Sequence, residues 1–212
     1  MNATLAYVFD PLCGWCYGAS AAVQALADSD AVTLKLLPSG LFQDEGARKM
    51  DDAFAAYAWS NDQRIERLTG QAFTPLYREL VLADRNQRFD SGPATLALTA
   101  VWLTQPEQEV NALKAIQHAR YVEGLDITRP DTLSSILRSL GLTDAAQRFD
   151  TPDAALHAAM AGRLAEAQDL MNRLGARGVP TFVRDVDGRQ TLLPAGAVYA
   201  NPKAFLAQLT EA

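Results

Sequence analysis

The sequence predicts an α/β protein in which a mixed four-stranded sheet with flanking helices is interrupted by a large helical domain. Short apolar runs, partly β-branched or aromatic as in strands, lie near both ends of the 212-residue chain. The long stretch between them repeats apolar residues at helical spacing. The expected order is therefore β-α-β, a helical block, and β-β-α, with one sheet assembled from both ends of the chain.

The first 37 residues are predicted to form a strand, a helix and a second strand. Residues 5–9 are apolar throughout, as in a buried strand, and Pro11 follows soon after them. An Ala-rich helix is expected from residue 13 to about residue 27. Residues 32–37 form the second predicted strand, which ends at Pro38.

Helical patterns dominate the middle of the chain. The predicted helices cover residues 50–68, 92–103, 106–122, 128–140 and 153–174. Pro93 in a first turn and Gly175 after a last turn are typical boundary residues. We therefore expect an inserted helical domain at residues 47–175, and a sheet-containing domain made of residues 1–46 and 176–212.

The C-terminal part returns to the β pattern. Residues 181–186 form the third predicted strand, and the Asp-Gly pair at residues 187–188 is typical of a hairpin turn. Residues 191–193 form the returning strand. A last helix is expected from residue 201, with Phe205 on its buried face.

Composition narrows the possible partners and ligands. The net charge of −6 and the pI of about 4.9 argue against a nucleic-acid partner, which needs a basic face. No apolar run is long enough for a membrane span, and the N-terminus has no secretory signal pattern, so a cytoplasmic location is expected. No phosphate-binding glycine loop or HExxH motif occurs, and we expect no cofactor and no metal.

Cys13 and Cys16 are the only cysteines, and they lie at the start of the first predicted helix. One helical turn separates them, so their sulfur atoms can meet. Free backbone N–H groups at a helix N-terminus favour a thiolate. The pattern therefore predicts a redox dithiol in which Cys13 attacks a substrate disulfide and Cys16 resolves the mixed disulfide by attacking the sulfur of Cys13.

Two residues lie between the cysteines and are candidate substrate contacts. Gly14 allows a tight turn in the loop. Trp15 is bulky and uncharged, so it cannot stabilise a thiolate as a protonated histidine could. We therefore expect an intermediate reduction potential.

Val179 and Pro180 directly precede the third predicted strand. A proline cannot donate to a strand ladder, and an X-Pro bond can be cis at low cost. A cis Pro180 beside the dithiol would leave the backbone of Val179 free to pair with an extended substrate. An ordinary proline between loop and strand is the alternative. Leu41 and Phe42 are expected to line the same cleft.

Other interpretations of the two cysteines stay open at this point. They could be half of a metal site shared with another chain, or inert core thiols. His118 and His157 lie far from them in the sequence and fit no zinc-ligand spacing. Both histidines are interpreted as packed or solvated residues.

The motif Cys13-Gly14-Trp15-Cys16, together with Pro180, resembles the thioredoxin superfamily. The helical insertion between the second and third strands is similar to that of the DsbA family. Residues 121–127 are similar to its FrnE-like cytoplasmic branch, which consists of predicted protein-disulfide isomerases.

This resemblance implies a thioredoxin fold and thiol–disulfide oxidoreductase activity. It assigns the roles of nucleophile to Cys13, resolving thiol to Cys16 and cis-proline to Pro180. The implied partners are proteins with thiols or disulfides, or small thiols such as glutathione. DsbA-type oxidases usually have Pro-His between the cysteines, where this chain has Gly-Trp, so reductase or isomerase activity stays open.

Two further classes compete with this interpretation. Kappa-class glutathione transferases and hydroxychromene carboxylate isomerases resemble this fold, but they have a serine or another single residue where the dithiol would start. This chain keeps both cysteines, so a glutathione-dependent transferase or isomerase is the second hypothesis. The third is a binding module without enzymatic activity, in which the dithiol only senses redox state.

Overall fold

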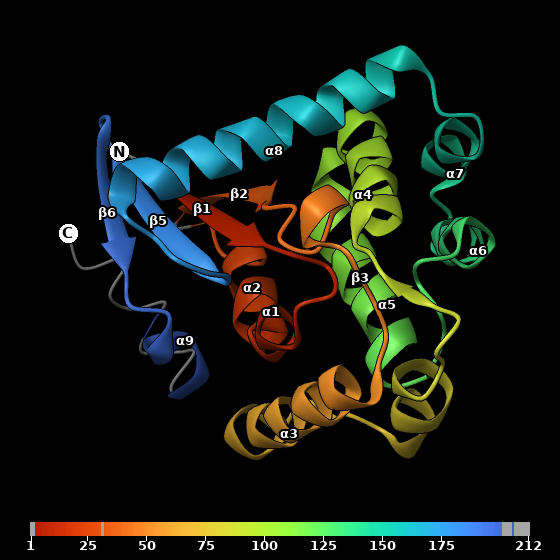
Figure 1. Cartoon of the computed structure of the whole chain (residues 1–212). Helices are drawn as coiled ribbons and strands as arrows, with labels where there is room; N and C mark the ends of the chain where they lie inside the picture. The colour runs from red at the N-terminus through yellow and green to blue at the C-terminus, as the bar shows by residue number, and fades with distance from the viewer. Residues whose placement is uncertain (1–2, 31, 201–204, 206–212) are drawn as a thin grey trace.

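A computed structural model describes residues 3–30, 32–200 and Phe205, and its centre is a four-stranded mixed sheet (Figure 1). The strands are β1 (Ala3–Phe9), β2 (Val32–Pro38), β5 (Thr181–Val186) and β6 (Arg189–Leu193), in the spatial order β2-β1-β5-β6. Strand β1 is parallel to β2, whereas β1 with β5 and β5 with β6 are antiparallel. The predicted sheet, with its strands drawn from both ends of the chain, is confirmed.

Strand β1 is buried on both faces because it is central in the sheet and covered by helices on each side. Leu5, Tyr7 and Phe9 belong to the main hydrophobic core. Ala6 and Val8 point to the opposite face, where they pack in a cluster with α8 (Ala154–Leu174). This double burial accounts for the continuous apolar run in the sequence.

The helix predicted at residues 13–27 is divided into α1 (Gly14–Gly18) and α2 (Ser20–Ala27). Ala19 lies between them, and its N–H donates to the carbonyl groups of both Trp15 and Cys16, at 3.2 Å each. Such a shared bond marks a tightened turn, which ends the regular α-helical pattern. The expectation of one continuous helix was therefore wrong at this residue.

The insertion between β2 and β5 is predominantly helical, as predicted. Its elements are η1 (Asp44–Gly46), β3 (Arg48–Lys49), α3 (Asp52–Thr69), the π-helix η2 (Tyr77–Leu82), β4 (Arg88–Phe89), α4 (Gly92–Thr104), η3 (Pro106–Gln108), α5 (Glu109–Tyr121), α6 (Pro130–Ser139), α7 (Thr143–Asp150) and α8. The two-residue ladder of β3 with β4 and the separate helix α7 were not predicted. The division of the chain at residues 46/47 and 175/176 stays a prediction.

The helix boundaries follow the expected signals. The Asp51 carboxylate accepts the N–H of Phe54 at 2.7 Å and caps α3, and the Asp153 carboxylate caps α8 in the same way. Gly175 ends α8 with φ 67°, a left-handed conformation that favours glycine. The helix predicted from residue 201 lies outside the described residues, apart from Phe205, whose buried ring packs against Phe182. The helix that precedes this region is α9 (Gly196–Ala200).

Helix α8 runs along one face of the sheet, opposite α1 and α2 (Figure 1). Its buried side includes a charged residue, Arg163, which forms a buried ion pair with Glu109 of α5 and donates to the carbonyl of Leu36 at 3.0 Å. Arg163 therefore ties the insertion to strand β2. Within the part of the chain that the structure describes, no helix is long and apolar enough to cross a bilayer.

Candidate active site

The two cysteines lie where the chain leaves β1 and enters α1. Cys13 is the N-cap residue of α1, and its N–H donates to the carbonyl of Asp10 at 3.1 Å. Cys16 lies in the first turn of the helix. Both cysteines carry free thiols in the structure. This is the placement at a helix start that the spacing predicted.

The two thiols differ in access to the surface. Cys13 keeps 7% of its surface exposed and lines a cavity, whereas Cys16 is fully buried. Burial, with a further contribution from the neighbouring Cys13, raises the pKa of the Cys16 thiol well above its ordinary value. The two residues therefore have the asymmetry that one attacking and one resolving thiol require.

A buried carboxylate fixes the loop before the dithiol. The Asp10 side chain accepts the N–H of Leu12 at 2.9 Å, the N–H of Phe42 at 3.1 Å and the hydroxyl of Ser91 at 2.8 Å. Burial raises the pKa of Asp10, and these hydrogen bonds oppose that rise. Three separate segments thus meet at one carboxylate. This role of Asp10 was not predicted, because its position just after the first predicted strand and before Pro11 indicates only the end of that strand.

The loop before β5 lies against the dithiol, although it is distant in the sequence. The Val179–Pro180 peptide bond is cis. The thiol of Cys13 faces the carbonyl oxygen of Val179 at 3.7 Å, across 166 residues of sequence. The two motifs singled out in the sequence therefore form one site. Pairing of the Val179 backbone with a substrate stays a prediction.

Gly14 and Trp15 line the cavity that Cys13 also lines. A Cβ atom on Gly14 would lie 2.4 Å from Oδ1 of Asp62 in α3, so this position has no room for a side chain. The Trp15 ring packs edge-on against Tyr199 with centroids 5.3 Å apart, and its carbonyl accepts the Tyr199 hydroxyl at 3.0 Å. Helix α9 thereby holds the residue that precedes Cys16.

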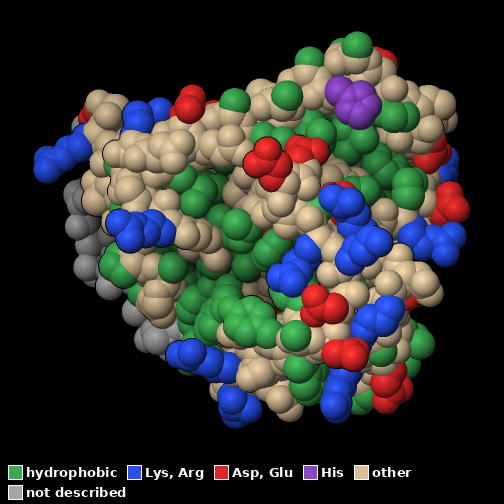
Figure 2. Space-filling view, in the orientation of Figure 1, with side chains coloured by type: hydrophobic (Ala, Val, Ile, Leu, Met, Phe, Trp, Pro, Cys, Tyr) green, Lys and Arg blue, Asp and Glu red, His purple; other side chains and the backbone are tan. Residues whose placement is uncertain are grey.

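The cavity beside Cys13 has a volume of about 260 Å³ and mostly apolar walls. Leu41 and Phe42 line it, as the sequence predicted. The other lining residues are Leu12, Cys13, Gly14, Trp15, Phe54, Tyr57, Ala58, Asn61, Asp62, Ile65, Tyr77, Phe89, Tyr121, Arg177, Gly178 and Val179. Figure 2 shows hydrophobic side chains gathered in a hollow of this face, over the region where Figure 1 places α1 and α3.

The insertion supplies an aromatic wall with a buried cation behind it. Tyr121 stacks on Tyr17 with centroids 4.7 Å apart and donates its hydroxyl to the carbonyl of Leu12 at 2.8 Å. Arg120 is fully buried, and its guanidinium lies 5.4 Å from the ring centroid of Tyr77. Within the described residues no hydrogen-bond partner lies in range of its side-chain nitrogens. Sequence reasoning found none of these residues.

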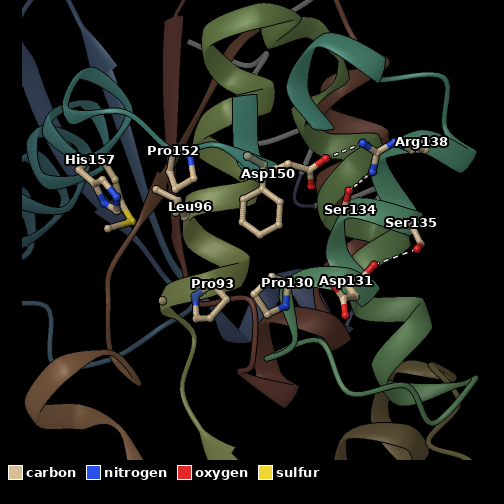
Figure 3. Close-up of a pocket in the computed structure, with 13 residues that line it drawn as sticks. Pro93, Leu96, Pro130, Asp131, Ser134, Ser135, Arg138, Asp150, Pro152 and His157 are labelled. Carbon is tan, nitrogen blue, oxygen red and sulfur yellow. Dashed lines mark hydrogen bonds and ion pairs between the residues drawn. The ribbon is translucent and has the colours of Figure 1, made fainter. Parts of the chain in front are cut away.

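A second and larger cavity lies away from the dithiol. It has a volume of about 740 Å³ and lies among α4, α6, α7 and α8 (Figure 3). Figure 3 shows Arg138 directed toward Asp150 and Ser134, with His157 at another edge. The other histidine, His118, is exposed and pairs with Glu123 at 3.1 Å. Neither histidine lines the cavity of Cys13.

A thioredoxin-like sheet, a dithiol at the first helix and a cis-proline opposite it define the class of protein. The family model of the DSBA-like thioredoxin domain matches residues 4–200, and the chain belongs to this family. It is a protein-disulfide oxidoreductase of the DsbA type. The predicted fold, family and enzyme class are confirmed.

Solved structures similar to the chain span its whole length. The cytosolic disulfide reductase DsbM from Pseudomonas aeruginosa is 36% identical, with a TM-score of 0.87, and the match covers 99% of this chain and 100% of that one. A structure of the same protein with GSH is 34% identical, with a TM-score of 0.84, and covers 97% and 98% of the two chains. A candidate protein disulfide isomerase from Nitrosomonas europaea is 22% identical, with a TM-score of 0.76 and coverage of 98% and 99%, and shows the fold alone. None of the curated proteins matches.

Proposed function

We propose that the protein reduces disulfides with the pair Cys13 and Cys16, and that Cys13 is the nucleophile. The observation that carries this proposal is the position of Cys13. It caps a helix, it is the only one of the two thiols that lines the cavity, and it faces the carbonyl of Val179 at 3.7 Å.

The reaction has two exchange steps. The Cys13 thiolate attacks one sulfur of a substrate disulfide, forms a mixed disulfide and releases the first substrate thiolate, which takes up a proton. Cys16 then attacks the Cys13 sulfur, the second substrate thiol leaves with the proton of Cys16, and an enzyme disulfide forms. One substrate disulfide is thus reduced while the enzyme dithiol is oxidised.

Two structures of one relative support the direction of electron flow and the kind of partner. The similarity to a cytosolic disulfide reductase favours reduction and a cytoplasmic location. The structure of that protein with GSH favours glutathione, free or in a disulfide, as a small partner. Arg177 is an exposed cation on the cavity wall and can attract a carboxylate of glutathione. Gly14 and Trp15 line the same cavity, where they can contact a bound substrate.

The second hypothesis, a glutathione transferase or isomerase of the kappa-class type, is not favoured. Such an enzyme needs only one reactive residue, whereas here a second, buried thiol follows the first one turn later. The similarity to a cytosolic disulfide reductase also favours a dithiol oxidoreductase over a transferase. The binding-module hypothesis is not retained, because the chain belongs to an enzyme family.

Reduction of insulin by the prereduced protein tests the proposal. Wild type should form insulin thiols, and Cys13→Ser should lose all activity because the nucleophile is gone. Cys16→Ser should stop after one mixed disulfide. Equal rates for wild type and Cys13→Ser would end the proposal. Turnover of an electrophile with glutathione by Cys16→Ser would support the transferase hypothesis.

A further inference from the structure

Asp62 is a buried carboxyl group on the wall of the dithiol cavity that the exchange steps described above do not use. It projects from α3, and its Oδ1 atom lies 2.4 Å from the point that a Cβ atom on Gly14, the residue after Cys13, would occupy. Both Asp62 and Cys13 line the cavity. A leaving thiolate in this cavity would therefore be released close to this carboxyl group.

The hydrogen bonding of Asp62 differs from that of another buried carboxylate near the dithiol, Asp10. Three donors surround Asp10, two N–H groups and one hydroxyl. Among the residues that the structure describes, Asp62 accepts one bond, from the hydroxyl of Tyr77 at 3.0 Å. A carboxyl group with few donors is poorly stabilised as an anion, so it keeps its proton more easily. Its free oxygen, Oδ1, points to the loop of the dithiol.

We propose that Asp62 is the general acid of the first exchange step and protonates the thiolate that leaves the substrate disulfide. This inference rests on the proposed reductase function. Burial raises the pKa of Asp62 to about 7, while the Tyr77 hydrogen bond and Arg120 oppose the rise. A proton donor with such a pKa suits catalysis near neutral pH.

In the first exchange step, the proton that the leaving thiolate needs comes from Asp62. The Cys13 thiolate forms a bond to one substrate sulfur, and the other sulfur leaves with the electron pair of the broken bond. The Asp62 carboxyl then transfers its proton to that sulfur, which gives a neutral thiol and the Asp62 carboxylate. Water entering the cavity returns a proton to Asp62 before the next cycle.

The charge environment of Asp62 is set by several elements. The buried Arg120 lowers its pKa from behind the aromatic wall. The groups that interact with the carboxyl are Tyr77 of η2 and Arg120 and Tyr121 of α5. Cys13 at the start of α1 and Arg177 of the loop before β5 line the same cavity. Neither Tyr77 nor Tyr121 supplies a proton near neutral pH, because burial raises the pKa of both hydroxyl groups.

The test compares two substrates whose leaving thiols differ in basicity. Prereduced protein reacts in single turnover with glutathione disulfide, whose leaving thiolate needs a proton, and with an activated aromatic disulfide, whose thiolate leaves without one. The quantity compared is the rate constant for glutathione disulfide divided by that for the aromatic disulfide. Because both reactions start with attack by Cys13, the protonation state of Cys13 affects both rate constants equally and cancels in this ratio. The ratio is measured below and above pH 7, so that its pH dependence shows whether a group with a pKa of about 7 protonates the leaving thiolate.

For wild type we expect the ratio to fall as the pH rises through about 7, since Asp62 loses its proton there. Asp62→Asn should lower the ratio about 100-fold below that pH and make it independent of pH. Tyr77→Phe removes the bond to the carboxylate, so it should move the fall to higher pH. Asp62→Asn with the ratio and pH profile of wild type, or with both substrates slowed equally, would overturn the proposal.

A matched control is Glu109→Gln. Burial also raises the pKa of Glu109 to about 7, but this residue pairs with Arg163 and does not line the cavity. In the Glu109→Gln variant the ratio of rate constants should decrease with rising pH as it does in wild type. A ratio that does not change with pH in this variant would contradict the assignment to Asp62. If the wild-type protein reduces neither disulfide, the proposed function fails, and the inference fails with it.

Discussion

The carboxylate of Asp62 occupies the space that a side chain at Gly14 would need. A Cβ atom on Gly14 would lie 2.4 Å from Oδ1 of Asp62 and 3.2 Å from Cδ1 of Ile65. The glycine between the two cysteines therefore lets the inserted helix α3 approach the dithiol loop. This contact joins the N-terminal motif to the insertion.

Gly14→Ala should destabilise the reduced protein by about 1–3 kcal/mol, because the new methyl group overlaps Asp62. Asp62→Ala removes the overlapping atoms, so the double variant should be more stable than the sum of the two single effects predicts. Urea unfolding of the four proteins measures this coupling. The control is Gly162→Ala in α8, where nothing lies within 4 Å and a gain of about 0.5–1 kcal/mol is expected. Additive effects at Gly14 and Asp62 would contradict the contact.

The stability of the protein should depend on the protonation of Asp62. Its folded pKa of about 7 lies above its ordinary value of 3.8, so the folded state holds this proton more tightly than the unfolded state. The stability from this group is fully present below about pH 4 and is lost as the pH rises to about 7, by up to about 1.4 kcal/mol per pH unit. Asp62→Asn should make the profile of unfolding free energy less steep in this window. An unchanged profile would show that Asp62 does not titrate there.

The buried pair of Arg163 and Glu109 should be needed for folding stability but not for chemistry. Arg163→Met leaves a buried carboxylate without its partner, so a loss of about 3–5 kcal/mol is expected. Replacing both residues, Arg163→Met with Glu109→Leu, should recover much of that loss. Urea unfolding checks both variants, and reduction rates of the folded protein should match those of wild type. A double variant less stable than Arg163→Met would contradict this account.

Tyr57 should contribute to substrate binding. Its side chain lines the dithiol cavity and is 66% exposed, so it contributes little to the folded core. Tyr57→Ala should raise the KM for a disulfide-containing peptide several-fold and leave the unfolding free energy nearly unchanged, within about 0.5 kcal/mol. The control is Leu80→Ala, which removes a 57% exposed side chain that does not line the cavity. Equal KM values for the two variants would remove Tyr57 from the binding surface.

Much of the fold follows from local patterns in the sequence. The apolar run of β1, the Asp-Gly turn between β5 and β6 and the capping residues of the long helices are encoded by neighbouring residues. The dithiol and Pro180 could be found for a similar reason, since each is a short motif beside a strand. Their mutual contact follows from the order of the strands.

The walls of the site could not be predicted in this way. Asp62, Tyr77 and Arg120 lie on three elements of the insertion, and only tertiary packing brings them to the dithiol. The residue type of Arg163 alone does not distinguish a buried arginine from an exposed one. A charged residue within an otherwise apolar face of a long helix is the one signal that could have singled out Arg163.

The most direct test of the proposed reaction is mass spectrometry of the Cys16→Ser variant after reaction with glutathione disulfide. Without the resolving thiol, the mixed disulfide cannot be released by an internal attack. We predict one glutathionyl group on the peptide that contains Cys13, formed faster than on an unfolded control of the same variant. An unmodified Cys13, or modification no faster than in the unfolded chain, would contradict the assignment of Cys13 as the nucleophile.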